Sequence, residues 1–205
     1  SFPGYEGNEN AQNYLELNAN ERALLQYAND LKDQGKINSI VVLINTSNAL
    51  EVDFLRDFDV DACMWVGGLG ISGTNAVTDI LAGKVNPSGS LVDTYCFDNF
   101  TSPAMINFIA QNYIIEEGVS IPQDISTYMV YQEGIYVGYR YYQTTGVPTA
   151  FPFGYGLSYT SFEYSDLTID HVSNTGATIR LTVKNTGEAA GAEVVQVYVA
   201  KPEHE

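Results

Sequence analysis

The sequence predicts an α/β fold: a mostly parallel sheet with helices on both faces, followed by a partial antiparallel β-sandwich. Short apolar runs alternate with helical patterns in the first half of the chain, which favours parallel strands joined by helical crossovers. The second half changes to alternating apolar and polar residues, which is typical of antiparallel strands. Of the 205 residues, 45% are hydrophobic and 17% charged, a composition typical of a globular chain.

The first helix is predicted over residues 20–32, where apolar side chains recur at helical spacing. Asn18 or Asn20 is available as its N-cap and Gly35 as its stop. The run "SIVVLI" at 39–44 then predicts a strand covered on both faces, because its apolar residues are continuous rather than alternating. A shorter helix is predicted over 49–58.

The same succession repeats once more before the pattern changes. "DACMWV" at 61–66 predicts a second buried strand, 74–82 a helix ended by Gly83, and 90–95 a third strand. Strands and helices that alternate in this way predict right-handed crossovers and a parallel sheet.

Residues 97–128 are mixed in character, and no element is predicted there. Three antiparallel strands are predicted farther on, at 166–172, 177–187 and 192–202, separated by Asn-Thr-Gly turns suited to positive φ. A complete sandwich of this kind takes about seven strands. The sandwich is therefore expected to be cut short within this sequence.

Charge and cysteine content limit the partners that the chain can have. The formal net charge is −16 with only 9 Lys and Arg, which argues against a nucleic-acid or anionic-membrane partner and favours a neutral ligand. Cys63 and Cys96 are too few for a disulfide framework and are expected to be reduced core thiols. No signal peptide is visible after Ser1, and a cytoplasmic location is favoured while the compartment stays open.

Glycines between the second strand and the helix that follows it raise the question of a nucleotide site. Gly68, Gly70 and Gly73 spell G-x-G-x-x-G, and Asp93 follows where a dinucleotide-binding fold keeps its ribose-binding acid. Such a fingerprint normally lies in the first βαβ unit, whereas here a strand-helix-strand unit precedes it. The alternative is that these glycines only turn the chain tightly.

Longer motifs carry a specific resemblance. "DILAGKVNPSGSL" at 79–91 and "YQEGIYVGYRYYQTTGVPTAFPFGYGLSYTSFEYS" at 131–165 closely resemble C-terminal segments of glycoside hydrolase family 3, the β-glucosidase and β-xylosidase family. The resemblance implies an incomplete α/β sandwich domain at 1–160 and a partial fibronectin type III-like domain at 161–205. It also implies that the glycines are geometric and bind no dinucleotide, so no cofactor is expected. His171 and His204 are separated from the cysteines and from each other, so no metal site is expected either.

The family implies a retaining mechanism with two carboxyl groups. Its nucleophile is an Asp on a (β/α)8 barrel domain, which this sequence does not show, so the chain alone is expected to be inactive. Its acid/base Glu lies in a G-E-G-like loop of the sandwich domain, and Glu6, between Tyr5 and Gly7, matches that motif, with Glu9 as runner-up. The alternative is that both are solvated charges near the start of the sequence.

Other residues support weaker interpretations. Trp65 stands at the end of a predicted strand beside the glycine turn, where it can border an outer sugar subsite or pack in the core. Glu133 is expected to pair with Arg140, and Asp61 to anchor a strand end.

The resemblance therefore predicts part of a retaining β-glycosidase that hydrolyses terminal β-linked glucosyl or xylosyl residues. Its expected partners are a β-linked oligosaccharide or aryl glycoside and the barrel domain of the same enzyme, with neither nucleic acid nor membrane. The alternative is a non-catalytic carbohydrate-binding or interaction module. Sugar preference, domain order and oligomeric state stay open.

Overall fold

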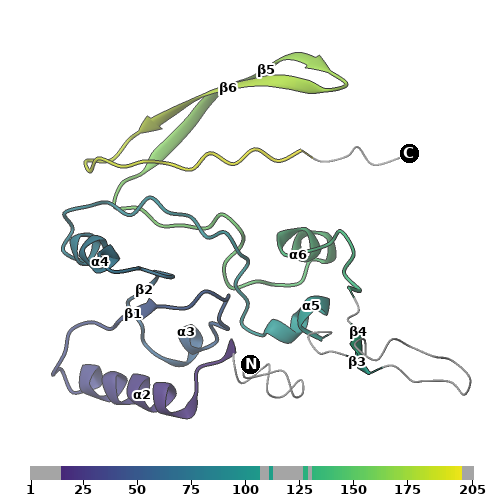
Figure 1. The fold of residues 1–205 in the computed structure, drawn as a ribbon. Helices are drawn as coiled ribbons and strands as arrows, with labels where there is room; N and C mark the ends of the chain where they lie inside the picture. The colour runs from purple at the N-terminus through teal and green to yellow at the C-terminus, as the bar shows by residue number, and fades with distance from the viewer. Residues whose placement is uncertain (1–14, 107–110, 113–126, 129–130, 200–205) are drawn as a thin grey trace, which may run out of the picture. The chain divides into compact units, whose positions relative to one another are not determined.

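The computed structural model describes residues 15–106, 111–112, 127–128 and 131–199 (Figure 1). Its described residues form two compact units, the first drawn from 1–69 and 92–153 and the second from 70–91 and 154–205. Helices accompany one parallel and two antiparallel strand pairs, so the predicted α/β class is confirmed.

In the first unit, the helix α2 (Ala19–Asp33) forms where the periodicity predicted it. The Asn18 side chain accepts hydrogen bonds from the amides of Asn20 and Glu21, at 2.9 and 3.1 Å, and the Glu21 carboxylate accepts the Asn18 amide at 2.8 Å. This capping box satisfies amides that the first turn leaves without helical partners. Gly35, with φ +66°, follows the C-cap and ends the helix.

The strands β1 (Val41–Ile44) and β2 (Ala62–Trp65) pair in parallel, in a register that aligns Val41 with Ala62 and Ile44 with Trp65. The predicted parallel pairing is thereby confirmed. Because the last residues of the two strands, Ile44 and Trp65, are paired, both strands end at the same edge. The residues that follow Ile44 and Trp65 therefore lie close together.

Burial along β1 alternates instead of being continuous. Ile44 is buried, whereas Val41 and Leu43 are 47% and 42% exposed. The prediction that this strand is covered on both faces is therefore wrong within the described residues. Successive side chains of a strand point to opposite faces, and only the Ile44 face of β1 is packed.

The helix α3 (Phe54–Asp57) is shorter than the predicted helix over 49–58. The amides of Leu55 and Arg56 donate to the carbonyls of Val52 and Asp53 at 3.2 and 2.8 Å, so the first turn starts at Val52 rather than at 49. The amides of Glu51 and Val52, which a first turn leaves without helical partners, donate to the carbonyls of Leu15 and Cys96 at 2.8 and 3.1 Å. Phe54 and Val52, fully buried, form the centre of the core.

Ion pairs hold α2 beside α3 and the start of β2. Arg22 binds the carboxylates of Asp53 and Asp57, and Lys32 binds Asp59 and Asp61 at 2.8 and 2.7 Å. Asp61 also accepts the Ile40 amide at 2.7 Å, which confirms its expected role as an anchor of a strand end. The Lys32 ammonium, together with that amide, lowers the pKa of Asp61.

The third parallel strand predicted over 90–95 does not form. Tyr95 instead makes an antiparallel bridge to Phe151, with amide-to-carbonyl distances of 2.9 and 3.1 Å. Leu91 and Tyr155 are joined similarly, the Leu91 amide donating to the Tyr155 carbonyl at 2.8 Å. The backbone groups that would extend the parallel sheet therefore bond to the segment around 151–155.

Short elements complete the first unit, mostly in the part for which the sequence predicts none. They are the 3-10 turn η1 (Asn99–Thr101), the helix α5 (Pro103–Ile106), the antiparallel pair β3 (Gln111–Asn112) and β4 (Thr127–Tyr128), and the helix α6 (Tyr139–Thr145). Gly146, left-handed at φ +70°, ends α6. The described core of the unit consists of Ile40, Ile44, Val52, Phe54, Tyr95, Cys96, Met105 and Tyr142.

In the second unit, the helix α4 (Gly73–Leu81) confirms the predicted helix over 74–82, and Gly83, at φ +69°, follows it. Asn86 lies just beyond Gly83, and its side chain forms hydrogen bonds with three other residues. Its amide nitrogen donates to the Ala190 carbonyl at 3.1 Å, and its oxygen accepts from the Ser158 hydroxyl at 3.1 Å and the Tyr159 amide at 2.8 Å.

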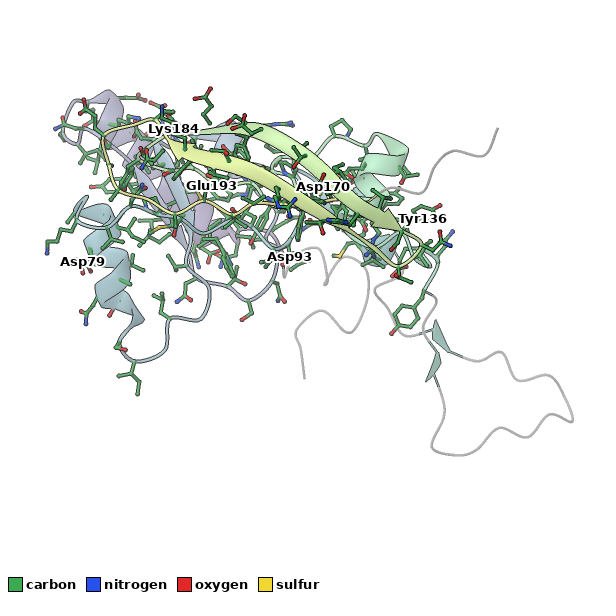
Figure 2. The ribbon with its side chains drawn as sticks, turned by 90° about the horizontal axis from the view of Figure 1, so that it is seen from above. Asp79, Asp93, Tyr136, Asp170, Lys184 and Glu193 are labelled. Atoms are coloured by element: carbon green, nitrogen blue, oxygen red, sulfur yellow. The ribbon has the colours of Figure 1, made fainter. Side chains whose placement is uncertain are left out.

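The strands β5 (Phe162–Ser173) and β6 (Gly176–Asn185) form an antiparallel hairpin whose two strands carry Asp170 and Lys184 (Figure 2). Their predicted pairing is confirmed. Two register shifts interrupt the ladder, and among the described residues the non-glycine positions with positive φ, Asp166 and His171, lie in β5 at these shifts. Neither Asn-Thr-Gly turn holds a residue with positive φ, so the expectation for these turns is wrong.

Residues 191–199 join no strand in the described part of the chain, so the prediction of a strand at 192–202 is wrong for them. Side-chain bonds hold the segment: the Gln196 amide donates to the Gly154 carbonyl at 3.0 Å, and Tyr164 donates to the Glu193 carboxylate. None of the helices in the described ranges has the length and apolar character needed to cross a membrane.

Candidate functional site

The carboxyl edge of the β1–β2 pair holds an exposed aromatic side chain in a fixed position. Trp65, the last residue of β2, is 38% exposed, and its indole nitrogen donates to the Thr46 carbonyl at 2.8 Å. The Val66 amide donates to the Ile44 carbonyl at 2.9 Å, so the chains leaving both strands stay joined. Part of the indole is therefore presented to solvent at the edge where open parallel sheets place their ligands.

Gly67 is shaped to the indole. Its φ is +55°, which L side chains rarely adopt, and a Cβ added there would lie 2.9 Å from Cζ2 of Trp65. Any side chain at this position would push the ring away. Part of the ring therefore packs on backbone and part is exposed, and its place at a sugar subsite stays a prediction.

The G-x-G-x-x-G glycines lie between β2 and the first residue of the helix α4 (Gly73–Leu81). Gly70 has φ +61°, and a Cβ at Gly68 or Gly70 would meet nothing within 4 Å. Gly73 opens α4, whose N-cap Ser72 makes no side-chain capping bond. The positive φ of Gly70 gives this glycine a geometric role in the turn, since L side chains rarely adopt it.

A buried carboxyl group that the sequence reasoning missed lies elsewhere in the first unit. Glu51 is 6% exposed and is the one charged side chain classed as buried among the described residues. Its carboxylate accepts the Asn99 amide at 2.8 Å, and its own amide donates to the Leu15 carbonyl at 2.8 Å. One residue thus joins three segments that are far apart in the sequence.

Burial raises the pKa of the Glu51 carboxyl group. The Asn99 amide acts in the opposite direction because it stabilises the ionised form, while the carboxylates of Glu16, Asp53 and Asp98 add to the rise. The only available signal in the sequence was a Glu within the apolar stretch "ALEVDF", which is too short to indicate burial.

The two cysteines are free and lie in different environments. Cys96 is buried and Cys63 is exposed, so the expectation of core thiols is confirmed for Cys96 and wrong for Cys63. Cys63 belongs to β2, in which Ala62, Cys63 and Trp65 are all exposed and only Met64 is half-buried. Tyr142 contacts the Cys96 thiol, and burial raises the pKa of this tyrosine to about 12.

The remaining candidates from the sequence fall into two groups. Glu6 and Glu9 lie outside the described residues, so their roles stay predictions. Glu133 and Arg140 form no ion pair in the described part of the chain, and the predicted pair is wrong. The Arg140 guanidinium lies 5.5 Å from the centroid of the neighbouring Tyr139 ring instead.

Comparison with known proteins identifies the family. Residues 2–159 match the model of the glycosyl hydrolase family 3 C-terminal domain. The chain belongs to glycoside hydrolase family 3. The resemblance carried by the N-P-S-G and F-P-F-G-Y-G-L-S-Y-T motifs is thereby confirmed.

Two curated family 3 relatives are β-glucosidases. The thermostable β-glucosidase B of Acetivibrio thermocellus is 34% identical over 198 residues, covering 95% of this chain and 23% of the relative. A β-glucosidase of Ruminococcus albus is 37% identical over 193 residues, covering 94% and 18%. The family 3 chain thus spans about a fifth of the length of these relatives.

A solved structure agrees with the family 3 assignment. β-Glucosidase 3B from Thermotoga neapolitana, in complex with α-D-glucose, superposes with a TM-score of 0.68 at 36% identity. The match covers 84% of this chain and 22% of the other. Family membership, fold class and the glycosidase relationship therefore rest on sequence and backbone geometry together.

Proposed function

We propose that this chain is part of a retaining β-glycosidase that hydrolyses terminal β-linked glucosyl or xylosyl residues. It supplies the acid/base loop, while the nucleophile lies on a (β/α)8 barrel domain of the same enzyme. The family match over residues 2–159 carries the proposal, because that range includes the motif around Glu6. The named relatives, both β-glucosidases, support the substrate class.

Glu6 is proposed as the acid/base residue. In a retaining mechanism this group first protonates the departing glycosidic oxygen and then, as its conjugate base, activates the water that releases the sugar. The two carboxyl groups must come within about 5 to 5.5 Å of each other. A loop that protrudes toward the barrel meets this requirement, and Gly4 and Gly7 around Glu6 suit such a loop.

The ionisation of Glu6 depends on its partner. A neighbouring negative nucleophile raises the pKa of the acid, which keeps its proton available at neutral pH. Without that neighbour, the isolated chain lacks the group that would raise the pKa of the acid. The isolated chain is accordingly proposed to be inactive.

Trp65 is proposed to border an outer sugar subsite. A sugar ring stacks its apolar face on an aromatic ring that is held in place and partly open to solvent. The bond from the indole nitrogen to the Thr46 carbonyl and the fit against Gly67 hold the ring in this way.

The domains at 1–160 and 161–205 remain the proposed division of the chain.

The decisive experiment replaces Glu6 in the intact enzyme and compares two aryl β-glucosides. Phenyl β-glucoside needs protonation of its leaving oxygen, whereas 2,4-dinitrophenyl β-glucoside releases an anion that is stable without it. Glu6→Ala is expected to lower kcat/KM for the phenyl substrate by about 10²–10⁴-fold, the usual contribution of a general acid. The change for the dinitrophenyl substrate is expected to be small.

Glu9→Ala is the matched control, since it removes a carboxyl group from the same loop. Azide gives a second reading, because it attacks the glycosyl-enzyme without a general base and is expected to restore turnover only in Glu6→Ala. If Glu9→Ala shows the selective loss instead, the runner-up carries the role. If neither variant loses activity while the chain still binds oligosaccharide, a non-catalytic carbohydrate-binding module is the better reading.

A further inference from the structure

The polar group of the Trp65 indole is already bonded within the protein. An indole has a single hydrogen-bond donor and no acceptor, and the N–H of Trp65 donates to the Thr46 carbonyl at 2.8 Å. The residue is nevertheless 38% exposed. A ligand that lies against the exposed part of the ring therefore contacts an apolar aromatic surface and receives no hydrogen bond from it.

Backbone from two segments holds the ring along one edge. Nε1 is bonded to Thr46, just after β1, and a Cβ added at Gly67, just after β2, would lie 2.9, 3.1 and 3.4 Å from Cζ2, Cη2 and Cε2. The missing side chain of Gly67 thus leaves the space that this edge of the ring occupies. Because the ring is already fixed, a ligand that stacks on it pays little for immobilising the side chain.

The position of the ring in the sheet decides which part of a substrate it meets. Trp65 and its partner Ile44 end the paired strands β2 and β1, at the carboxyl edge where open parallel sheets place their ligands. An enzyme that removes terminal sugars holds the terminal ring in an inner subsite and the leaving group in an outer one. A ring that borders the outer subsite therefore meets the leaving group.

We propose that Trp65 selects the leaving group of the reaction by stacking alone, so that leaving groups with a flat apolar ring face are preferred to small alcohols. The inference rests on the proposed function, in which Trp65 borders the outer subsite. Gly67 is a positioning residue, because it makes room for the edge of the indole. A stacked ring strengthens such a contact by about twofold to tenfold beyond the burial of its area.

The test uses the intact enzyme with benzyl β-glucoside and methyl β-glucoside. Their leaving alcohols have similar acidity, so both substrates need the same protonation, and only the benzyl group carries a ring. Trp65→Phe and Trp65→Leu form a matched pair, because both lose the bond to Thr46 and both stay apolar, but only Phe keeps a flat ring. For benzyl β-glucoside, kcat/KM is expected to be about twofold to tenfold lower in Trp65→Leu than in Trp65→Phe, while the two variants agree within about twofold for methyl β-glucoside.

The role of the indole N–H is tested by comparing Trp65→Phe with the wild-type enzyme. Its kcat/KM for benzyl β-glucoside is expected to stay within about threefold of wild type, because the missing N–H binds Thr46 rather than the ligand. A tenfold loss in Trp65→Phe would show that the N–H binds the leaving group, which contradicts stacking alone.

Gly67→Ala tests the positioning of the ring without altering the ring itself. It is expected to lower kcat/KM for benzyl β-glucoside by about twofold to tenfold and to leave methyl β-glucoside unchanged. Gly68→Ala is the matched control, since a Cβ there meets nothing within 4 Å, and is expected to affect neither substrate. This pair keeps the inference testable if Trp65→Leu fails to fold.

Two results would overturn the inference. Equal values of kcat/KM for benzyl β-glucoside in Trp65→Phe and Trp65→Leu would mean that the flat ring contributes nothing. Losses in Trp65→Leu and Gly67→Ala that are as large for methyl as for benzyl β-glucoside would make the ring purely structural. Failure of the proposed acid role is distinguishable, since Glu6→Ala would then keep wild-type activity on both substrates, whereas the Trp65 comparison is made at constant leaving-group acidity.

Discussion

Replacing Asn86 by alanine is expected to loosen the second unit through the loss of three hydrogen bonds. The side chain donates to the Ala190 carbonyl and accepts from the Ser158 hydroxyl and the Tyr159 amide, at 3.1, 3.1 and 2.8 Å. These bonds join the N-P-S-G loop to the F-P-F-G-Y-G-L-S-Y-T segment and to the residues after β6. Alanine cannot bond to any of these three groups, so each must hydrogen-bond to water instead.

The size of the effect follows from the environment of each bond. An intramolecular hydrogen bond contributes about 1 kcal/mol net, so three such bonds give about 3 kcal/mol. The bonds to Ala190 and Tyr159 are exposed, where water replaces part of the loss, and the bond to Ser158 is half-buried. The free energy of unfolding is therefore expected to fall by about 2 kcal/mol, or roughly 4–8 °C in Tm for a chain of this length.

Two measurements on the 205-residue chain check this expectation. Thermal unfolding followed by circular dichroism gives the change in Tm, and amide hydrogen exchange gives the protection of the Tyr159 N–H. Asn75→Ala, at an exposed position of α4, is the matched control and is expected to change the free energy of unfolding by less than about 0.5 kcal/mol. An Asn86→Ala chain with wild-type Tm and unchanged exchange at Tyr159 would refute the reasoning.

Two further predictions concern the first unit. Burial raises the pKa of Glu51 in the folded state, so between its unfolded and folded pKa values the folded chain holds a proton that the unfolded chain has lost. The free energy of unfolding is therefore expected to fall as pH rises through that window, and Glu51→Gln is expected to flatten the slope in urea titrations at several pH values; an unchanged slope contradicts the shift. Gly67→Ala places a Cβ 2.9 Å from the Trp65 ring at φ +55°, which is expected to destabilise the chain by about 1–3 kcal/mol and to shift the emission of Trp65, its single tryptophan, whereas Gly68→Ala, with open space, is expected to leave the emission unchanged.

Sequence patterns predicted the elements whose information is local. α2 carries its own periodicity and cap, with Asn18 and Glu21 three residues apart, and α4 likewise ends at a glycine. The β1–β2 pairing followed from two apolar runs joined by a crossover. In each case the residues that decide the element lie within it or next to it.

Two predicted elements, the strand over 90–95 and the helix over 49–58, differ from the structure where their residues bond to distant parts of the chain. Residues 90–95 have the composition of a strand, but the amide and carbonyl of Tyr95 bond to Phe151, more than fifty residues away. The helix predicted over 49–58 shortens to Phe54–Asp57, and Glu51 before it bonds to Leu15 and Asn99. Propensity describes what a segment prefers alone, and long-range hydrogen bonds override it.

The candidate site divides in the same way. Trp65 could be placed from the sequence because it ends a strand beside a glycine turn, and the structure adds the bond to Thr46 that orients the ring. Glu51 could not, since nothing in its neighbours along the chain indicates that Leu15 and Asn99 meet it. Glu6 is reached by family resemblance alone, and its role stays a prediction.

Hydrogen bonds, rather than apolar packing alone, fix the segments around Asn86 and Glu51. Burial of apolar surface is non-directional, whereas a hydrogen bond constrains both distance and angle. Asn86 and Glu51 each join segments distant in sequence through such bonds, while Val41 and Leu43 of β1 stay exposed. A buried carboxylate such as Glu51, whose amide and side chain both bond to distant backbone, therefore joins three segments at a cost in stability.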